Sequence, residues 1–215
     1  KAFSKAFKVY ELDDYILDVP AGNLNHELLP KDITKRLKKA VGLCDRLVVS
    51  TEALAHELRG SNADIRVVLN RLPPAMWGER PPVRSNSRPL RRGERKPVVG
   101  WAGGVGHGGD LELIVELVRE THREIDWVFF GMCPDDIRDH VHSYHPGVPT
   151  LEYPKQLMRV SQQWDLALAP LEINTFNECK SNLRLLEYGW CGVPVICTDI
   201  VPYQGDLPVT RVKNR

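Results

Sequence analysis

The sequence predicts an α/β fold: a Rossmann-like, doubly wound parallel sheet accompanied by a partial second α/β unit. Short runs rich in apolar residues, such as Arg46–Val49 and Trp127–Phe130, indicate buried strands, and stretches with helical periodicity, such as Asp32–Gly42, also occur. A glycine-rich turn, Gly103–Gly109, follows one strand and opens a helix. Strands that alternate with helices in this way favour a parallel sheet with helices on both faces.

The composition excludes several classes of protein. The 215 residues are 42% hydrophobic and 27% charged, which is ordinary for a globular chain of one large or two small domains. A net charge of +1 gives no indication of nucleic-acid binding. No apolar run approaches the ~20 residues of a membrane helix, and residues 1–8 lack the apolar stretch of a signal peptide.

The cysteines and histidines indicate neither a disulfide framework nor a metal site. The five cysteines are scattered without a CxxC pair, so we expect thiols in a reducing, cytoplasmic compartment. His140, His142 and His145 lie close together, but their spacing suits a helix end before a turn better than a metal cluster. The Asp13-Asp14 pair is also expected to end a strand rather than to bind metal.

The first region, residues 1–73, shows a βαβαβ rhythm. Ser50 or Thr51 is expected to cap its second helix, because these side chains accept hydrogen bonds from the first turn. The expected elements are a strand over Phe7–Leu12, a helix over Asp32–Gly42, a strand over Arg46–Val49, a helix after Thr51 and a strand over Ile65–Leu69.

Residues 74–96 form a basic, proline-rich linker or long loop. Its charges are expected to be solvated, with a phosphate-facing role left open for one or two of its arginines. These are Arg80, Arg84, Arg88, Arg91, Arg92 and Arg95.

Residues 97–215 predict a second, doubly wound domain. The loops Gly103–Gly109 and Asn174–Lys180 both follow strand ends, so both should lie on the ligand-binding edge of its sheet. The expected strands are Pro97–Ala102, Trp127–Phe130, Thr150–Tyr153, Leu166–Ala169 and Val193–Cys197, and the expected helices begin at Asp110, near Asp135, near Gln156 and at Ser181.

Lys180 and Ser181 stand where the last of these helices should begin. A helix start offers unpaired N–H groups and a positive dipole end, and a neighbouring lysine makes it attractive to phosphate. Glu187 lies on the same helical stripe as Lys180 and Arg184, about 10 Å from Lys180, where it could accept hydrogen bonds from a ribose. The alternative is a plain N-cap at Ser181 and a solvated Arg184–Glu187 pair.

The turn Gly104–Gly109 matches GxGxxG, a pattern of phosphate-proximal loops. A dinucleotide fold should also carry an acidic residue at the end of the second strand, but that strand ends in Phe129-Phe130-Gly131. The lack of this acidic residue argues against NAD binding. His107 could hydrogen-bond a phosphate or a sugar hydroxyl, or simply be exposed in the turn.

Four segments resemble the nucleotide-sugar-binding half of GT-B glycosyltransferases, of the retaining, family-four-like branch that builds bacterial surface polysaccharides. They are GWAGGVGHGGDLELI, DWVFFG, DLALAPLE and FNECKSNLRLLEYGWCGVPVI, which begin at residues 100, 126, 165 and 176. YELDD, CDRLVVSTEALA and VLNRLPPAMW further upstream resemble the end of the N-terminal, acceptor-side half and the crossover. The chain is therefore expected to be a fragment, or a homologue with a reduced first domain.

The resemblance implies a role for each matching residue. Gly103 and Gly104 would approach the donor diphosphate, with His107 replacing a lysine often found there. Glu187 would bind the ribose, and Glu172–Phe176 would line the sugar pocket. The implied donor-binding set is Gly103, Gly104, His107, Asn177, Lys180, Ser181, Asn182, Leu183 and Glu187, and the implied catalytic set is Lys180, Glu178 and Glu187.

The family usually has a second glutamate eight positions before the one matching Glu187, but Cys179 stands there and Glu178 is nine positions back. The resemblance implies transfer of a sugar from a UDP-, GDP- or dTDP-sugar to a glycan, lipid-linked or protein acceptor, with no metal required. A non-catalytic sugar-nucleotide-binding or assembly module is the alternative. Peripheral membrane association of a longer parent protein stays open, as do the base, the sugar and the anomeric outcome.

Overall fold

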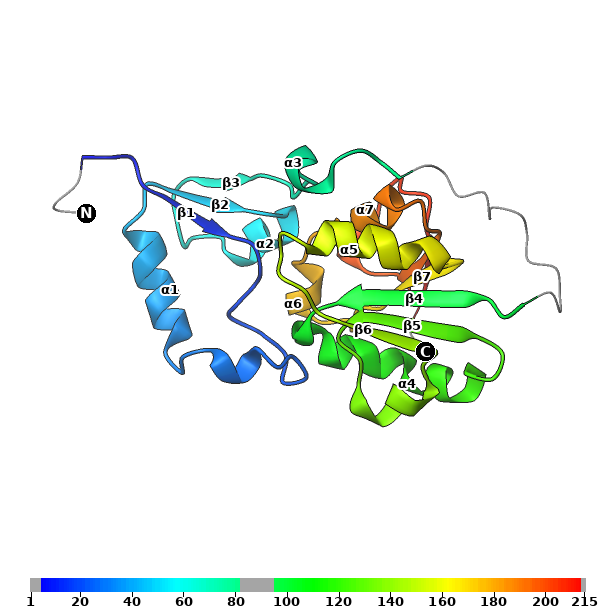
Figure 1. Cartoon of the computed structure of the whole chain (residues 1–215). Helices are drawn as coiled ribbons and strands as arrows, with labels where there is room; N and C mark the ends of the chain where they lie inside the picture. Colours follow the sequence, from blue (N-terminus) through cyan, green and yellow to red (C-terminus); the bar gives the residue numbers. More distant parts are fainter. Residues whose placement is uncertain (1–4, 82–94, 214–215) are drawn as a thin grey trace.

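The chain forms two parallel β-sheets that lie next to each other (Figure 1). A computed structural model describes residues 5–81 and 95–213. Most of the expected linker, including Arg84, Arg88, Arg91 and Arg92, lies outside the described residues. Within the described ranges, no helix is long and apolar enough to cross a membrane.

The smaller sheet has the strand order β1-β2-β3, with all strands parallel. Thr51 caps α2, because its Oγ1 accepts a hydrogen bond from the Leu54 amide at 3.1 Å. Apolar side chains from the strands and from both helices form one core, which also contains Cys179 from the other half of the chain. The elements are β1 (Val9–Leu12), η1 (His26–Leu28), α1 (Ile33–Gly42), β2 (Arg46–Val49), α2 (Glu52–Glu57) and β3 (Ile65–Val67).

The larger sheet has the order β6-β5-β4-β7-β8-β9, and every pair is parallel. The chain runs outward from β4 through β5 to β6 and then returns to the other side of β4, so the strand order reverses between β4 and β7. Its strands are β4 (Val98–Gly103), β5 (Asp126–Gly131), β6 (Ser143–Pro146), β7 (Leu166–Ala169), β8 (Val195–Thr198) and β9 (Thr210–Val212).

A crevice opens at this reversal. The β4–β7 ladder pairs only Val99 with Leu166 and Gly100 with Ala167. Beyond it, the Tyr188 hydroxyl accepts from the Ala102 amide at 2.9 Å and donates to the Ala102 carbonyl at 3.3 Å. The strands therefore separate at their carboxyl ends, which is where open α/β sheets bind ligands.

Helices cover both faces of the larger sheet. In Figure 1, α4 lies below the strands, and α5 and α7 lie above them. The strands alternate accordingly: Trp101 and Phe129 pack in the cluster with α4, whereas Ala102 and Phe130 pack in the cluster with α5 and α7. The remaining elements are α3 (Pro74–Trp77), η2 (Val105–His107), α4 (Gly108–Thr121), η3 (Asp135–His140), α5 (Tyr153–Val160), η4 (Ser161–Gln163), α6 (Thr175–Glu178), α7 (Leu183–Trp190) and η5 (Val201–Tyr203).

The α/β, Rossmann-like class is confirmed, but several elements differ from the expectation. The strand expected over Thr150–Tyr153 was wrong: the edge strand is β6, and α5 begins at Tyr153, where Pro154 suits the first helical turn. The expected loop Asn174–Lys180 contains α6, so the next helix begins at Leu183 rather than Ser181. The division into domains at residues 73 and 97 stays a prediction, although Trp77 is buried in the core of the larger sheet.

Candidate functional site

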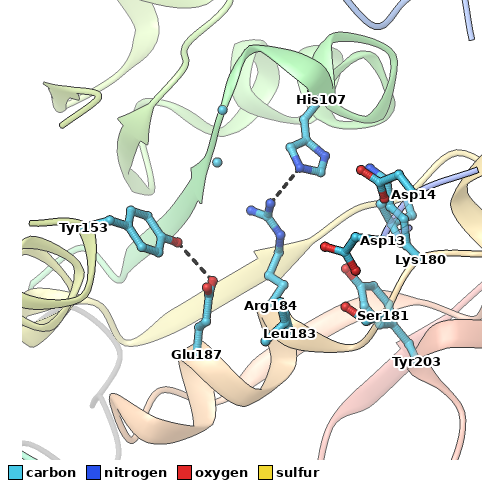
Figure 2. Close-up of a pocket in the computed structure, with 13 residues that line it drawn as sticks. Asp13, Asp14, His107, Tyr153, Lys180, Ser181, Leu183, Arg184, Glu187 and Tyr203 are labelled. Atoms are coloured by element: carbon cyan, nitrogen blue, oxygen red, sulfur yellow. Dashed lines mark hydrogen bonds between the residues drawn. The ribbon is translucent and has the colours of Figure 1, made fainter. Parts of the chain in front are cut away.

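A cavity of about 280 Å³ lies at the carboxyl ends of strands from both sheets (Figure 2). Asp13 and Asp14 reach it from the end of β1, and the glycine loop reaches it from the end of β4. Its lining residues are Asp13, Asp14, Gly103, Gly104, His107, Tyr153, Leu171, Lys180, Ser181, Leu183, Arg184, Glu187 and Tyr203.

The start of α7 supplies hydrogen-bond donors to one wall. Asn182 is the N-cap residue, and its side chain makes no capping hydrogen bond. Within the described ranges, the amides of Ser181, Asn182 and Leu183 have no hydrogen-bond partner. Ser181 Oγ accepts a hydrogen bond from Asn70 Nδ2 at 3.0 Å, which holds the turn against the smaller sheet. The arrangement fits an anion at this helix end.

Lys180 adds a cation beside these amides. Its Nζ lies 4.8 Å from the centre of the Phe176 ring, and no ion-pair partner of Lys180 occurs in the described part of the chain. Burial lowers the pKa of the Lys180 ammonium, while the carboxylates of Asp110 and Asp14 act in the opposite direction. A partly buried ammonium without an ion-pair partner gains from an anionic ligand.

Glu187 lies one turn into α7, where its Oε2 accepts a hydrogen bond from the Tyr153 hydroxyl at 3.0 Å (Figure 2). Tyr153 is held in turn by stacking on Phe130, with ring centres 5.5 Å apart. Burial raises the pKa of Glu187, while the Arg184 charge and the Tyr153 hydrogen bond act against this. The polar partner of Glu187 is therefore Tyr153 rather than Arg184, unlike in the solvated pair that we considered from the sequence.

Arg184 belongs to a different hydrogen-bonded chain. Its Nη2 lies 2.9 Å from His107 Nε2, and His107 Nδ1 lies 2.7 Å from Asp110 Oδ2. The guanidinium carbon lies 5.4 Å from the centre of the Trp101 ring. Burial and the Arg184 charge together lower the pKa of His107 to about 4, although Asp110 acts in the opposite direction. His107 is therefore neutral at pH 7.

The structure brings seven of the predicted residues to this one cavity: Gly103, Gly104, His107, Lys180, Ser181, Leu183 and Glu187. The other three do not line it, although the Asn182 amide belongs to the helix start beside it. Glu178 and Asn182 line a neighbouring cavity of about 230 Å³, which shares Lys180 and Ser181 with the first. Asn177 is buried, and its Nδ2 donates to Asp110 Oδ1 at 2.7 Å and to the Glu172 carbonyl at 2.9 Å.

The residues that the sequence did not place in the site are Asp13, Asp14, Tyr153, Leu171 and Tyr203. The aspartates could have been found, because they directly follow an expected strand. Tyr153 could not, because its segment was expected to be a strand. In the part of the chain that the structure describes, no three or more His, Cys, Asp or Glu side chains are arranged to hold a metal ion.

Comparison with known proteins gives a fold and no sequence family. No protein-family model matches the chain, and no curated protein sequence matches it. Among solved structures, Anabaena Alr3699/HepE in complex with UDP and glucose is similar over 95% of this chain, with a TM-score of 0.58 and 12% identity. A mutant of S. aureus TarM in complex with Fondaparinux, alpha-GlcNAc-glycerol and UDP is similar over 86%, with a TM-score of 0.55 and 14% identity.

These neighbours are GT-B glycosyltransferases, and at such low identities the likeness shows the fold alone. The chain thus has an α/β, Rossmann-like fold like that of GT-B glycosyltransferases. It spans 57% of the length of the Alr3699/HepE chain and 37% of that of the TarM chain.

Proposed function

We propose that this chain is the donor-binding part of a retaining, family-four-like GT-B glycosyltransferase. The reaction is transfer of a sugar from a nucleoside diphosphate sugar to a glycan, lipid-linked or protein acceptor of surface polysaccharide synthesis, in the cytoplasm. The observation that carries the proposal is the start of α7, where free amides and the Lys180 cation meet in one cavity. Glu187 lies one turn further, about 6 Å along the helix, at the separation of a ribose from its diphosphate.

In this proposal the diphosphate lies at the amides of Ser181, Asn182 and Leu183, beside Lys180. Negative charge develops on the diphosphate as the bond to the sugar breaks. Fixed donors and cations at that position stabilise the transition state more than the ground state. Lys180 and Arg184 supply the positive charge here, so the proposal involves no metal. Glu178 lies on the neighbouring cavity and has no assigned step.

The donor site can be tested by calorimetry with UDP, GDP and dTDP. UDP is the first choice, because the Alr3699/HepE and TarM complexes contain it. Lys180→Ala should weaken UDP binding by about 1.5–3 kcal/mol, the range for a hydrogen bond to a charged group. Lys38→Ala, on the exposed face of α1, is the matched control and should bind as the wild type does. Equal affinity in wild type and Lys180→Ala would exclude this placement of the diphosphate.

A non-catalytic sugar-nucleotide-binding module is the second candidate. It is favoured by the buried Cys179 at the position of the expected glutamate and by the location of Glu178 outside the cavity. Such a module would bind UDP through the same residues but would not cleave a UDP-sugar. Slow hydrolysis of a UDP-sugar by the wild type, lost in Lys180→Ala, would favour the enzyme. No hydrolysis by the longest available form of the protein would favour the module.

A further inference from the structure

Asp110 connects three separate parts of the ligand-binding edge. It lies in the first turn of α4, and its carboxylate is almost completely buried. Oδ1 accepts hydrogen bonds from the Glu172 amide at 2.8 Å and from Asn177 Nδ2 at 2.7 Å. Oδ2 makes its one hydrogen bond within the described residues to His107 Nδ1, at 2.7 Å. Asp110 thereby joins the glycine loop to the loop after β7. Through His107 it is also connected to α7.

These contacts fix which nitrogen of His107 carries the proton. A carboxylate only accepts hydrogen bonds, so Nδ1 must be the protonated nitrogen of the neutral ring. Nε2 is then unprotonated and accepts a hydrogen bond from Arg184 Nη2. Both ring nitrogens are used within the protein, which leaves neither to contact a phosphate directly.

We propose that Asp110 and His107 are positioning residues that hold Arg184 toward the donor diphosphate. The inference rests on the proposed function and adds a role for three residues of the same site. Arg184 Nη1 is buried and has no hydrogen-bond partner in the described part of the chain. It lies against Gly103, where a Cβ would come within 2.9 Å of it. The guanidinium is thus directed at the backbone of the glycine loop on the cavity wall (Figure 2).

The neutral imidazole also keeps Arg184 from a competing partner. Glu187 is three residues further along α7, and side chains at this spacing are neighbours on a helix. An Arg184 released from His107 would turn to the Glu187 carboxylate. That pair would remove both the cation from the diphosphate and the carboxylate from the ribose. The hydrogen bond from Arg184 to His107 therefore keeps two ligand-binding groups apart.

Asp110→Asn tests this arrangement with almost no change in shape. The two donors at Oδ1 require an acceptor, so the new amide keeps its oxygen there and directs its NH₂ group at His107 Nδ1. Nδ1 must then accept a hydrogen bond, so the ring proton moves to Nε2. The Nε2–H group and the Arg184 N–H then face each other, and two donors form no hydrogen bond. A comparable carboxylate-to-amide change in the serine protease triad acts through the wrong histidine tautomer.

We expect Asp110→Asn and Arg184→Ala each to weaken UDP binding about 10-fold or more in calorimetry of the full chain. The double variant should be no weaker than Arg184→Ala, because coupled residues are not additive. His107→Gln, whose amide oxygen can still reach Arg184, should bind better than His107→Asn, which is too short. Asp32→Asn, at an exposed carboxylate paired with Arg36, is the matched control and should bind as wild type does.

The tautomer itself is visible in ¹⁵N NMR, with the His107 signals assigned by their loss in His107→Gln. A proton on Nδ1 in wild type and on Nε2 in Asp110→Asn is the expected result. Wild-type UDP affinity in Asp110→Asn, an unchanged tautomer, or additive losses in the double variant would each overturn the positioning role. If wild type itself does not bind UDP, the proposed function fails, while the tautomer measurement still decides whether Asp110 sets the proton on His107.

Discussion

One carboxylate oxygen of Glu187 accepts a hydrogen bond from the Tyr153 hydroxyl. The second oxygen has no hydrogen-bond partner in the part of the chain that the structure describes. That second oxygen is the group we assign to the ribose. Glu187→Gln should weaken UDP more than 2′,3′-dideoxy-UDP, because only UDP offers hydroxyls to the carboxylate. Calorimetry with both nucleotides measures the difference. Equal loss for the two nucleotides would show that Glu187 does not contact the ribose.

The neutral state of His107 should appear in the pH dependence of stability. The folded pKa of about 4 lies below the ordinary 6.5, mainly because of burial and Arg184. Unfolding therefore takes up a proton between these values, and wild type loses stability as the pH falls from 6.5 toward 4. Over this window the loss from His107 should be on the order of 1–3 kcal/mol.

Urea unfolding of wild type and His107→Gln at pH 7.0, 5.5 and 4.5 measures this contribution. The difference in unfolding free energy between the two proteins should move in favour of the variant as the pH falls. Glu187, whose pKa is raised by burial, acts in the opposite direction in both proteins and cancels in the comparison. A difference that stays constant with pH would show that His107 is not held neutral by the fold.

Among the elements, the strands that could best be predicted are those marked by a short run of apolar residues in the sequence itself. β2 and β7 match their expected bounds, because three of the four residues of β2 and all four of β7 are apolar and each strand lies between turns or helices. β6 and β9 were missed because their residues, SYHP and TRV, carry no apolar run. They are strands only because a neighbouring strand offers a backbone edge for pairing.

The same distinction applies to the site. Lys180, Ser181 and Glu187 could be predicted together because one short segment carries them, in the turn before α7 and in α7 itself. Tyr153 could not be added, since it comes from a segment distant in the sequence that only the folded chain brings to the cavity. Asp14 was open to prediction, because it directly follows an expected strand. The connection of Asp110 to Arg184 through His107 likewise depends on tertiary packing, although Asp110 itself stood out as a helix-start residue.

β4 owes its position to a close fit that can be tested at Gly100. A Cβ at Gly100 would lie 1.9 Å from the Trp164 ring, which is fully buried. Gly100→Ala should therefore destabilise the protein by about 1–3 kcal/mol, lowering the melting temperature by about 2–4 °C per kcal/mol. Gly189→Ala in α7, where a Cβ meets nothing within 4 Å, is the control and should be neutral or stabilising. An unchanged melting temperature in Gly100→Ala would contradict the tight packing of Trp164 on β4.

At the level of the whole molecule, the two sheets are joined by direct contacts around the cavity. Thr51 Oγ1 donates to the Cys179 carbonyl at 2.7 Å, and the Gly109 amide donates to the Gly22 carbonyl at 3.1 Å. Asn70 contacts both Asp13, at 2.7 Å, and Ser181. The cavity walls from β1 and from α7 are therefore held in one arrangement.

We expect this chain to bind UDP but to transfer sugar poorly or not at all. Alignment of an acceptor hydroxyl with the anomeric carbon can supply about 7–11 kcal/mol of barrier lowering. In a two-domain cleft, those contacts come mainly from the domain opposite the donor. Here the smaller sheet contributes three strands, and the chain spans 37–57% of its two structural neighbours. A radiolabelled UDP-sugar assay on this chain and on a longer form tests this, and equal turnover by both would contradict it.

The position of Asp14 beside Lys180 makes proton uptake part of anion binding. Partial desolvation raises the pKa of Asp14, the positive charge of Lys180 counteracts this rise, and Asp13 adds to it. An anion that pairs with Lys180 cancels the influence that favours the ionised carboxylate. The pKa of Asp14 must then rise further, so over the pH range in which Asp14 titrates the complex holds more protons than the free protein and anion together. By linkage, a diphosphate bound at Lys180 is held more tightly as protons become more available, in the range where Asp14 titrates.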